Sequence, residues 1–157
     1  MGLIISAFTG IQYLGKQVEI IQYEAHYDIV MYEGEPTKNF LQIDHAGYPM
    51  HAGVLVDGGY YYYSDEMRVE ISYSDYGKFI DYAEDFFNKQ RISNPLIMLT
   101  DFTDCDGVIS NKMCVKIYDA LLYAESEHDF TYPNQFFKLL MRTFYRAITK
   151  NGIVVYW

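Results

Sequence analysis

The segment of the sequence most suggestive of chemistry is an acidic loop that contains Asp101, Asp104 and Asp106. Alternate carboxylates around a glycine are typical of loops that wrap a calcium ion, because the turn lets several oxygens converge on it. When the glycine at position 107 is aligned with the invariant glycine of such loops, Phe102 replaces the first carboxylate and Met113 replaces the bidentate glutamate. Two essential ligands are missing, so the loop does not predict a calcium site.

The same loop resembles the nucleophilic aspartate loop of haloacid dehalogenase-type phosphatases. Those enzymes need a lysine and a further acidic pair downstream on a doubly wound sheet, whereas this sequence has no Asp or Glu after Asp129. We therefore interpret Asp104 and Asp106 as residues that hold a tight turn and stabilise the start of the next helix. A metal-assisted hydrolase centred on Asp101, Asp104 and Asp106 is retained as an alternative function.

Histidines and cysteines form no strong metal-ligand pattern. His45 and His51 share a loop rich in Gly and Pro, but their spacing matches no strong zinc motif, and we expect both to be exposed. Cys105 and Cys114 cannot form a disulfide framework for a chain with this much apolar sequence. We expect two free thiols in a reducing cytosol, and neither a metal nor a cofactor.

A basic stripe near the end of the sequence is the first candidate binding site. Lys138, Arg142, Arg146 and Lys150 recur at every fourth position, and residues 130–157 contain no acid. This spacing places the four cations on one face of a helix. Guanidinium groups on such a face can hold a phosphate or carboxylate through charge-assisted hydrogen bonds. We therefore take Lys138, Arg142 and Arg146 as candidate ligand-binding residues.

The alternative is that the stripe is an ordinary solvated helix face, which is the common role of such charges. It would then lie near the acidic face of an earlier helix, at Asp81, Glu84 and Asp85. Ion pairs between exposed groups of this kind are weak.

A run of four tyrosines is the second candidate, in a sequence with 17 tyrosines in all. On a strand, Tyr60 and Tyr62 face one side while Tyr61 and Tyr63 face the other. We expect one pair to join the core and the other to be exposed, where tyrosine provides a large and rigid contact area. Tyr61 and Tyr63 complete the set of candidate ligand-binding residues. The alternative is that tyrosine is simply common in sheets.

The bulk properties narrow the possible partners. With 157 residues, the chain is predicted to form a single domain, 1–157, with one core. Its net charge of −9 opposes binding to a nucleic-acid backbone or to an anionic membrane. The first residues do not read as a signal peptide, and no apolar run is long enough to span a bilayer. We expect a cytoplasmic protein.

The elements that must position these residues follow from the spacing of apolar positions. Residues 3–8, 18–21, 68–73 and 153–157 read as strands, and residues 54–56 and 60–63 read as a hairpin around Asp57-Gly58-Gly59. Residues 23–50 read as loop with short strand pieces. The predicted fold class is α+β, a mostly antiparallel sheet with three helices packed on one face and a C-terminal strand.

Three helices are predicted from a period of 3.6 residues, beginning after Ser74, Ser110 and Asn134. Asn151 and the following glycine should close the third helix. The positions expected to face the core are Tyr76, Phe79, Ile80, Ala83, Phe86 and Phe87 in the first helix, Cys114, Ile117, Leu121 and Leu122 in the second, and Phe136, Phe137, Leu140, Met141, Phe144 and Ile148 in the third.

Four motifs taken in order resemble a family of uncharacterised small proteins from phages and bacteria. They are Met-Gly-Leu at 1–3, Ser-Tyr-Ser-Asp-Tyr at 72–76, Phe-Thr-Asp-Cys-Asp-Gly-Val-Ile at 102–109 and Asn-Gly-Ile-Val at 151–154. The family has an Arg-Ala-Gly stretch before the second motif, where this chain has Val69, Glu70 and Ile71. The resemblance implies a phage or mobile-element setting and no particular activity.

Taken together, these features favour a non-catalytic binding protein. The resemblance suggests a phage counter-defence factor in the host cytosol, which either occludes a host protein or sequesters a small anionic signal such as a nucleotide. The alternatives are the metal-assisted hydrolase and a structural protein that forms homo-oligomers through the aromatic hairpin.

Overall fold

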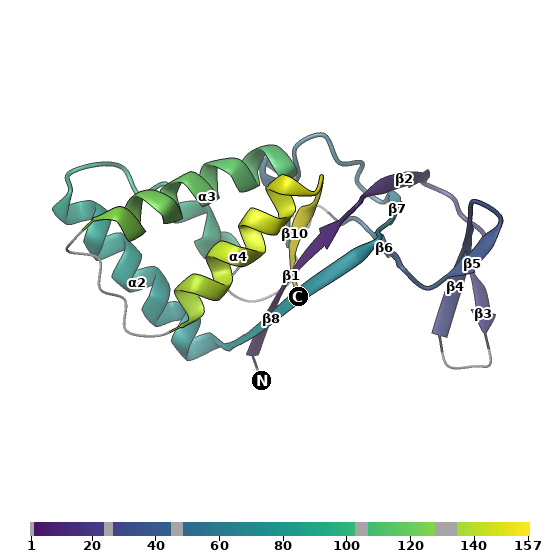
Figure 1. Ribbon diagram of the computed structural model, residues 1–157, viewed down its shortest axis with the longest axis horizontal. Helices are drawn as coiled ribbons and strands as arrows, with labels where there is room; N and C mark the ends of the chain where they lie inside the picture. Colours follow the sequence, from purple (N-terminus) through teal and green to yellow (C-terminus); the bar gives the residue numbers. More distant parts are fainter. Residues whose placement is uncertain (1, 24–26, 45–48, 103–106, 128–134) are drawn as a thin grey trace.

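The computed structural model describes residues 2–23, 27–44, 49–102, 107–127 and 135–157. Its centre is a four-stranded antiparallel sheet in the order β8-β1-β10-β9 (Figure 1). The late strand β10 therefore lies between β1 and β9. The strands of this main sheet are β1 (Gly2–Thr9), β8 (Asp65–Ser72), β9 (Gly107–Ile109) and β10 (Ile153–Tyr156).

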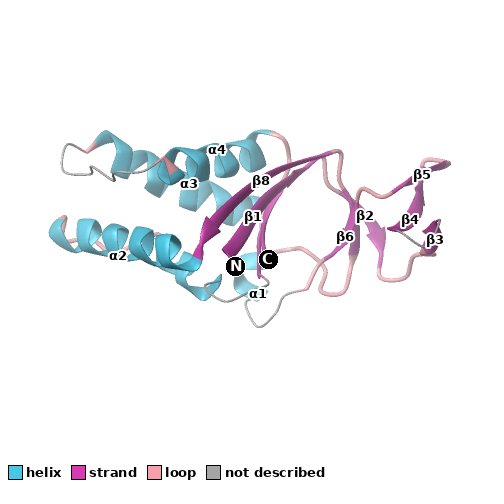
Figure 2. Cartoon of the chain, turned by 90° about the horizontal axis from the view of Figure 1, so that it is seen from below, coloured by secondary structure: helices cyan, strands magenta, loops and turns pink. Residues whose placement is uncertain are grey.

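Three long helices pack on one face of the main sheet, and Figure 2 shows them grouped at one end of the molecule. They are α2 (Tyr73–Lys89), α3 (Asn111–Ser126) and α4 (Phe136–Thr149). A four-residue helix, α1 (Pro49–Ala52), and a 3-10 helix, η1 (Ile97–Phe102), lie in the connections. The predicted α+β fold class, with its helices on one face, is confirmed.

Six shorter strands extend the molecule away from the helices (Figure 1). One sheet has the order β2-β7-β6 and the other has the order β3-β4-β5. We call the second of these sheets the distal lobe. The strands are β2 (Gln12–Gly15), β6 (Phe40–Gln42), β7 (Tyr60–Tyr62), β3 (Ile21–Tyr23), β4 (Tyr27–Tyr32) and β5 (Glu35–Thr37).

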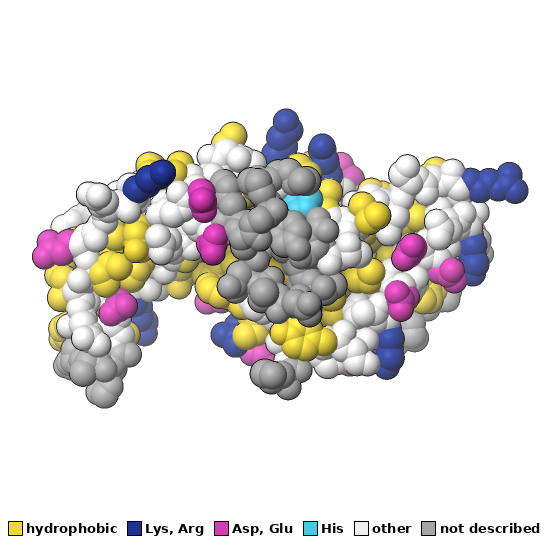
Figure 3. Space-filling model, turned by 180° about the vertical axis from the view of Figure 1, so that it is seen from behind, with side chains coloured by type: hydrophobic (Ala, Val, Ile, Leu, Met, Phe, Trp, Pro, Cys, Tyr) yellow, Lys and Arg dark blue, Asp and Glu magenta, His cyan; other side chains and the backbone are white. Residues whose placement is uncertain are grey.

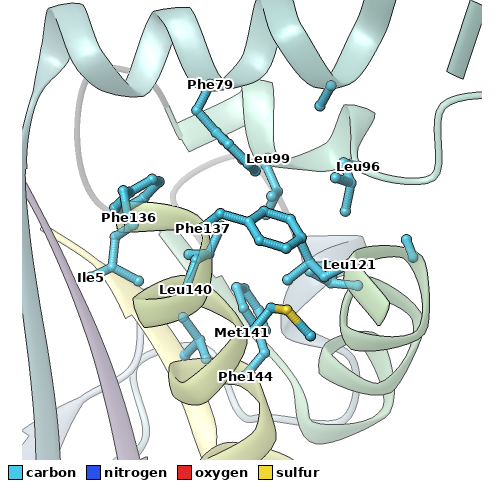
Figure 4. Close-up of a cluster of buried hydrophobic side chains, with 14 of the residues drawn as sticks. Ile5, Phe79, Leu96, Leu99, Leu121, Phe136, Phe137, Leu140, Met141 and Phe144 are labelled. Atoms are coloured by element: carbon cyan, nitrogen blue, oxygen red, sulfur yellow. The ribbon is translucent and has the colours of Figure 1, made fainter. Parts of the chain in front are cut away.

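The helical core lies between the three helices and the main sheet. Side chains alternate along a strand, so Leu3, Ile5 and Ala7 of β1 all face this core. Figure 4 shows aromatic and aliphatic side chains from α4 meeting others from α2, α3 and η1. Those labelled from α4 are Phe136, Phe137, Leu140, Met141 and Phe144.

Two tyrosines bring polar groups into the helical core. The hydroxyl of Tyr76 donates to the Leu99 carbonyl at 2.8 Å and lies 3.2 Å from the hydroxyl of Tyr156. Burial raises the pKa of both phenols well above the ordinary value. Both rings therefore stay neutral and hydrogen-bonded, which makes their burial tolerable.

A second core covers the opposite face of the main sheet. The main sheet contributes Phe8, Val108, Ile153 and Val155, and the rest of this core is Leu41 of β6, Ile43 just after it, Ala52 of α1 and Tyr61 of β7. The backbone of Ile43 is anchored there, because its N–H donates to the Gly59 carbonyl and its carbonyl accepts from the Gly58 N–H, each at 2.8 Å. The second core joins the main sheet to the β2-β7-β6 sheet.

The helix predictions hold in most respects. All six inward positions of α2 are buried, Ser110 caps α3, and the N–H of Gly152 donates to the Ala147 carbonyl to close α4. The prediction that Ser74 caps α2 is wrong: the N-cap is Ser72, whose hydroxyl accepts from the Asp75 N–H at 3.0 Å.

Two inward positions need correction. Leu122 is 46% exposed, and Ile148 is only partly buried at the edge of the helical core. The predicted start of the third helix at Asn134 lies outside the described residues.

The predicted hairpin is wrong in its pairing. Gly58 has the positive φ that the turn requires, at 74°, and the Gly59 N–H donates to the Val56 carbonyl at 2.9 Å. However, residues 54–56 form no strand, and β7 pairs with β2 and β6. Likewise, of the predicted strand 18–21 only Ile21 belongs to a strand, β3.

Candidate functional site

The basic stripe of α4 is divided between two environments. Arg146 forms an ion pair with Asp65 of β8 rather than with the acidic face of α2. Lys138 and Arg142 remain exposed and line a groove of about 270 Å³ between α3 and α4, together with Glu125 of α3. A carboxylate beside the two cations weakens their attraction for an anion. The three predicted cations therefore do not form one continuous anion site.

The tyrosine run packs inward instead of presenting an exposed pair. Tyr61 is 6% exposed and its hydroxyl accepts from the Val56 N–H at 3.1 Å. Tyr63 is half-buried against Phe8, with ring centroids 4.6 Å apart, and burial raises the pKa of its phenol. Tyr60 and Tyr62 are also half-buried, so the expected exposed pair is not found.

Tyr62 has a structural role that the sequence did not indicate. Its ring stacks on Tyr32 of β4, with centroids 3.8 Å apart and planes only 10° from parallel. Val30, on the same face of β4 as Tyr32, is 2% exposed. These contacts attach one face of the distal lobe to the rest of the molecule.

The opposite face of the distal lobe is apolar and points outward. Residues paired across antiparallel strands share a face, and the pairs here are Ile21 with Ile29, Tyr23 with Tyr27, and Met31 with Pro36. We call these six residues the lobe face. Exposure is 40% for Ile21, 46% for Tyr23, 41% for Tyr27 and 52% for Met31, whereas Ile29 at the middle of β4 is only 9% exposed. Large apolar side chains gathered in this way are typical of an interaction surface.

One charged side chain contacts the lobe face: Lys38 lies 5.5 Å from the ring centroid of Tyr27. Glu19, Glu33 and Glu35 are exposed in the neighbouring sequence, and Glu35 pairs with Tyr32 and so belongs to the inner face. Figure 3 shows hydrophobic and acidic side chains side by side on this part of the molecule. The sequence signal for this surface was the alternation of Tyr27, Ile29 and Met31, in a segment that we interpreted as mostly loop.

The acidic loop cannot be placed, because Asp104 and Asp106 lie outside the described residues, as does the side chain of Asp101. Among the described residues, no three His, Cys, Asp or Glu side chains gather in a way that could hold a metal ion. The expectation that His51 is exposed is wrong, since it is 4% exposed and its carbonyl accepts from the Ser110 N–H at 2.6 Å. His45 lies outside the described residues.

Of the two cysteines, Cys114 is a free thiol, as predicted, and Cys105 lies outside the described residues. Cys114 lies on the buried face of α3 and is fully buried, and this burial raises the pKa of its thiol. Because the thiolate is the reactive form, Cys114 is a core residue rather than a nucleophile.

Comparison with known proteins adds no relative to these observations: no family model, no curated protein and no solved structure matches the chain. Within the described residues, no helix combines the length and the apolar character needed to cross a membrane.

Proposed function

We propose that this chain is a non-catalytic binding protein that occludes a host protein with the lobe face, as a counter-defence factor of a phage or mobile element. The observation that carries the proposal is the exposure of Ile21, Tyr23, Tyr27 and Met31 on one face of a small sheet. Aromatic residues and methionine are enriched at protein interfaces, where they supply much of the contact area.

The attachment of the distal lobe supports this role. Tyr32 and Val30 fix the inner face through the stack on Tyr62 and through burial. These contacts favour one orientation of the lobe face in the free protein. A pre-organised surface loses less conformational entropy on binding, which increases affinity.

Charge narrows the class of partner. The net charge of −9 favours a partner that is basic over one that is acidic. It disfavours nucleic acid, an anionic membrane and a second copy of this chain, since each would bring like charges together. We therefore favour a basic protein over homo-oligomeric assembly.

The test is co-purification from a bacterial host with a tagged chain, followed by a binding assay with the purified partner. The double variant Tyr27→Ser with Met31→Ser should stay folded and lose the partner, because both side chains are exposed. Tyr145→Ser with Ile97→Ser is the matched control, since Tyr145 is 52% exposed and Ile97 is 64% exposed on other elements. A partner held equally by the lobe variant would rule out the lobe face.

A further inference from the structure

A pocket of about 720 Å³ lies away from the distal lobe, where the start of α3 meets the end of α4 and the loop at 53–55. Its volume falls within the range of small-molecule sites, about 300 to 1,000 Å³. Its lining includes Lys112, Lys116, Leu55, Met113 and Ile153. Of the candidate ligand-binding residues predicted from the sequence, Tyr61 also lines this pocket.

Hydrogen bonds fix the helix that carries the two lysines. The Ser110 hydroxyl accepts from the Met113 N–H at 3.4 Å, and the Asn111 side-chain amide donates to the carbonyls of Ala147 at 2.9 Å and Gly152 at 3.1 Å. The first turn of α3 is thereby tied to the end of α4. A site built on such fixed elements keeps its geometry without a ligand.

The two lysines make the pocket electropositive in an acidic protein. Lys112 and Lys116 are four positions apart on α3, so they lie on the same side of the helix. In the described part of the chain neither forms an ion pair, and no acidic residue lines the pocket. This distinguishes the pocket from the groove beside Arg142, where Glu125 is present.

Much of the rest of the wall is apolar, and Ser110, Asn111 and Asn151 add polar groups to it. Ile11, Leu55, Met113 and Ile153 come from four different segments and line the same pocket. An apolar wall beside two cations suits a ligand that carries a flat ring at one end and a negatively charged group at the other. A bare anion would leave this apolar surface uncovered.

We propose that this pocket binds a nucleotide, with its phosphates on Lys112 and Lys116 and its base against the wall formed by Leu55, Met113 and Ile153. Ammonium groups bind phosphate through charge-assisted hydrogen bonds. Among the described residues that line the pocket there is no carboxylate that would repel the phosphates. This activity is separate from occlusion of a protein by the lobe face.

The experiment measures thermal stabilisation and calorimetric affinity of the purified full chain with linear and cyclic nucleotides, the corresponding nucleosides, and inorganic pyrophosphate. At least one nucleotide should raise the melting temperature in a concentration-dependent manner, and nucleosides and pyrophosphate should bind more weakly. Lys112→Ala with Lys116→Ala should weaken nucleotide binding by about tenfold or more. Leu55→Asp should weaken it as well, through repulsion and loss of the apolar contact.

The matched control is Lys78→Ala with Lys89→Ala, which makes the same charge change on exposed positions of α2. It should bind nucleotide like the unmodified chain, and all variants are checked for native circular dichroism. Three results would each overturn the assignment: no stabilisation by any nucleotide, unchanged affinity in the Lys112 and Lys116 variant, or pyrophosphate bound as tightly as the best nucleotide.

Discussion

The helical half of the molecule and the strand-rich half use apolar residues in different ways. In the helical half, large side chains from α2, α3 and α4 are buried against the four-stranded main sheet. In the strand-rich half, the strands are short, the second core is smaller, and the distal lobe leaves one apolar face exposed. The first arrangement buries apolar area that stabilises the fold, and the second leaves apolar area exposed, which we propose as a binding surface.

This division lets the proposed binding surface of the distal lobe coexist with a stable fold. Residues of the lobe face can change without opening the helical core, since the lobe is attached through the contacts of Val30 and Tyr32. Binding surfaces are commonly carried by segments that contribute little to global stability. Three substitutions, in the helical core, in the second core and at the attachment of the distal lobe, test whether global stability depends mainly on the helical core.

The largest effect is expected in the helical core. Phe144 is fully buried, so Phe144→Ala should lower the free energy of unfolding by about 3 to 5 kcal/mol through lost burial and the cavity it leaves. Urea denaturation followed by circular dichroism measures the change. The neighbouring Tyr145→Ala, at a half-exposed position, is the control and should cost less than about 1 kcal/mol. Equal effects at the two positions would show that α4 does not bury this face.

An intermediate effect is expected in the second core. Ile43 is 1% exposed, and Ile43→Ala should cost about 2 kcal/mol, at the low end of the range for such changes because the smaller core can relax around the cavity. The same denaturation assay applies. A loss of stability as large as that of Phe144→Ala would mean that the second core stabilises the fold as much as the helical core does.

The smallest effect is expected where the distal lobe is attached. Tyr32→Leu keeps an apolar side chain but removes the stack on Tyr62, and such aromatic pairs contribute about 0.5 to 1.5 kcal/mol. The free energy of unfolding should fall by no more than about 1.5 kcal/mol, while amide exchange in β4 should become faster. Unchanged exchange in β4 would indicate that burial of Val30 alone holds the lobe.

The helical half could be predicted from sequence because its signals are local. A period of 3.6 residues identified every buried position of α2, and Ser110 marked the start of α3. The prediction that Leu122 is buried was wrong, because its burial depends on which elements flank α3. Local spacing does not specify those elements. The predicted hairpin partner of β7 was wrong for a similar reason. Its partners, β2 and β6, are distant in sequence, and strand propensity does not indicate which strands pair.

The candidate site was harder to predict than the fold. Arg146 appeared available as an anion ligand because its partner, Asp65, belongs to a strand 81 positions away. The tyrosine run is unusual in composition and was predicted to present an exposed pair, yet all four of its side chains are buried or half-buried. The lobe face was not predicted, because Gly34 and Pro36 interrupt the segment and the short strands around them resemble a loop in sequence.

The position of β10 also bears on how the chain folds as it is made. A ribosome completes β1, β8 and β9 before it reaches β10, yet β10 lies between β1 and β9 in the finished sheet. Until then β1 has one open edge, and β9 lacks the only strand with which it pairs in this sheet. Open edges beside exposed apolar surface promote aggregation. Nascent chains should therefore need protection by a chaperone until β10 has emerged.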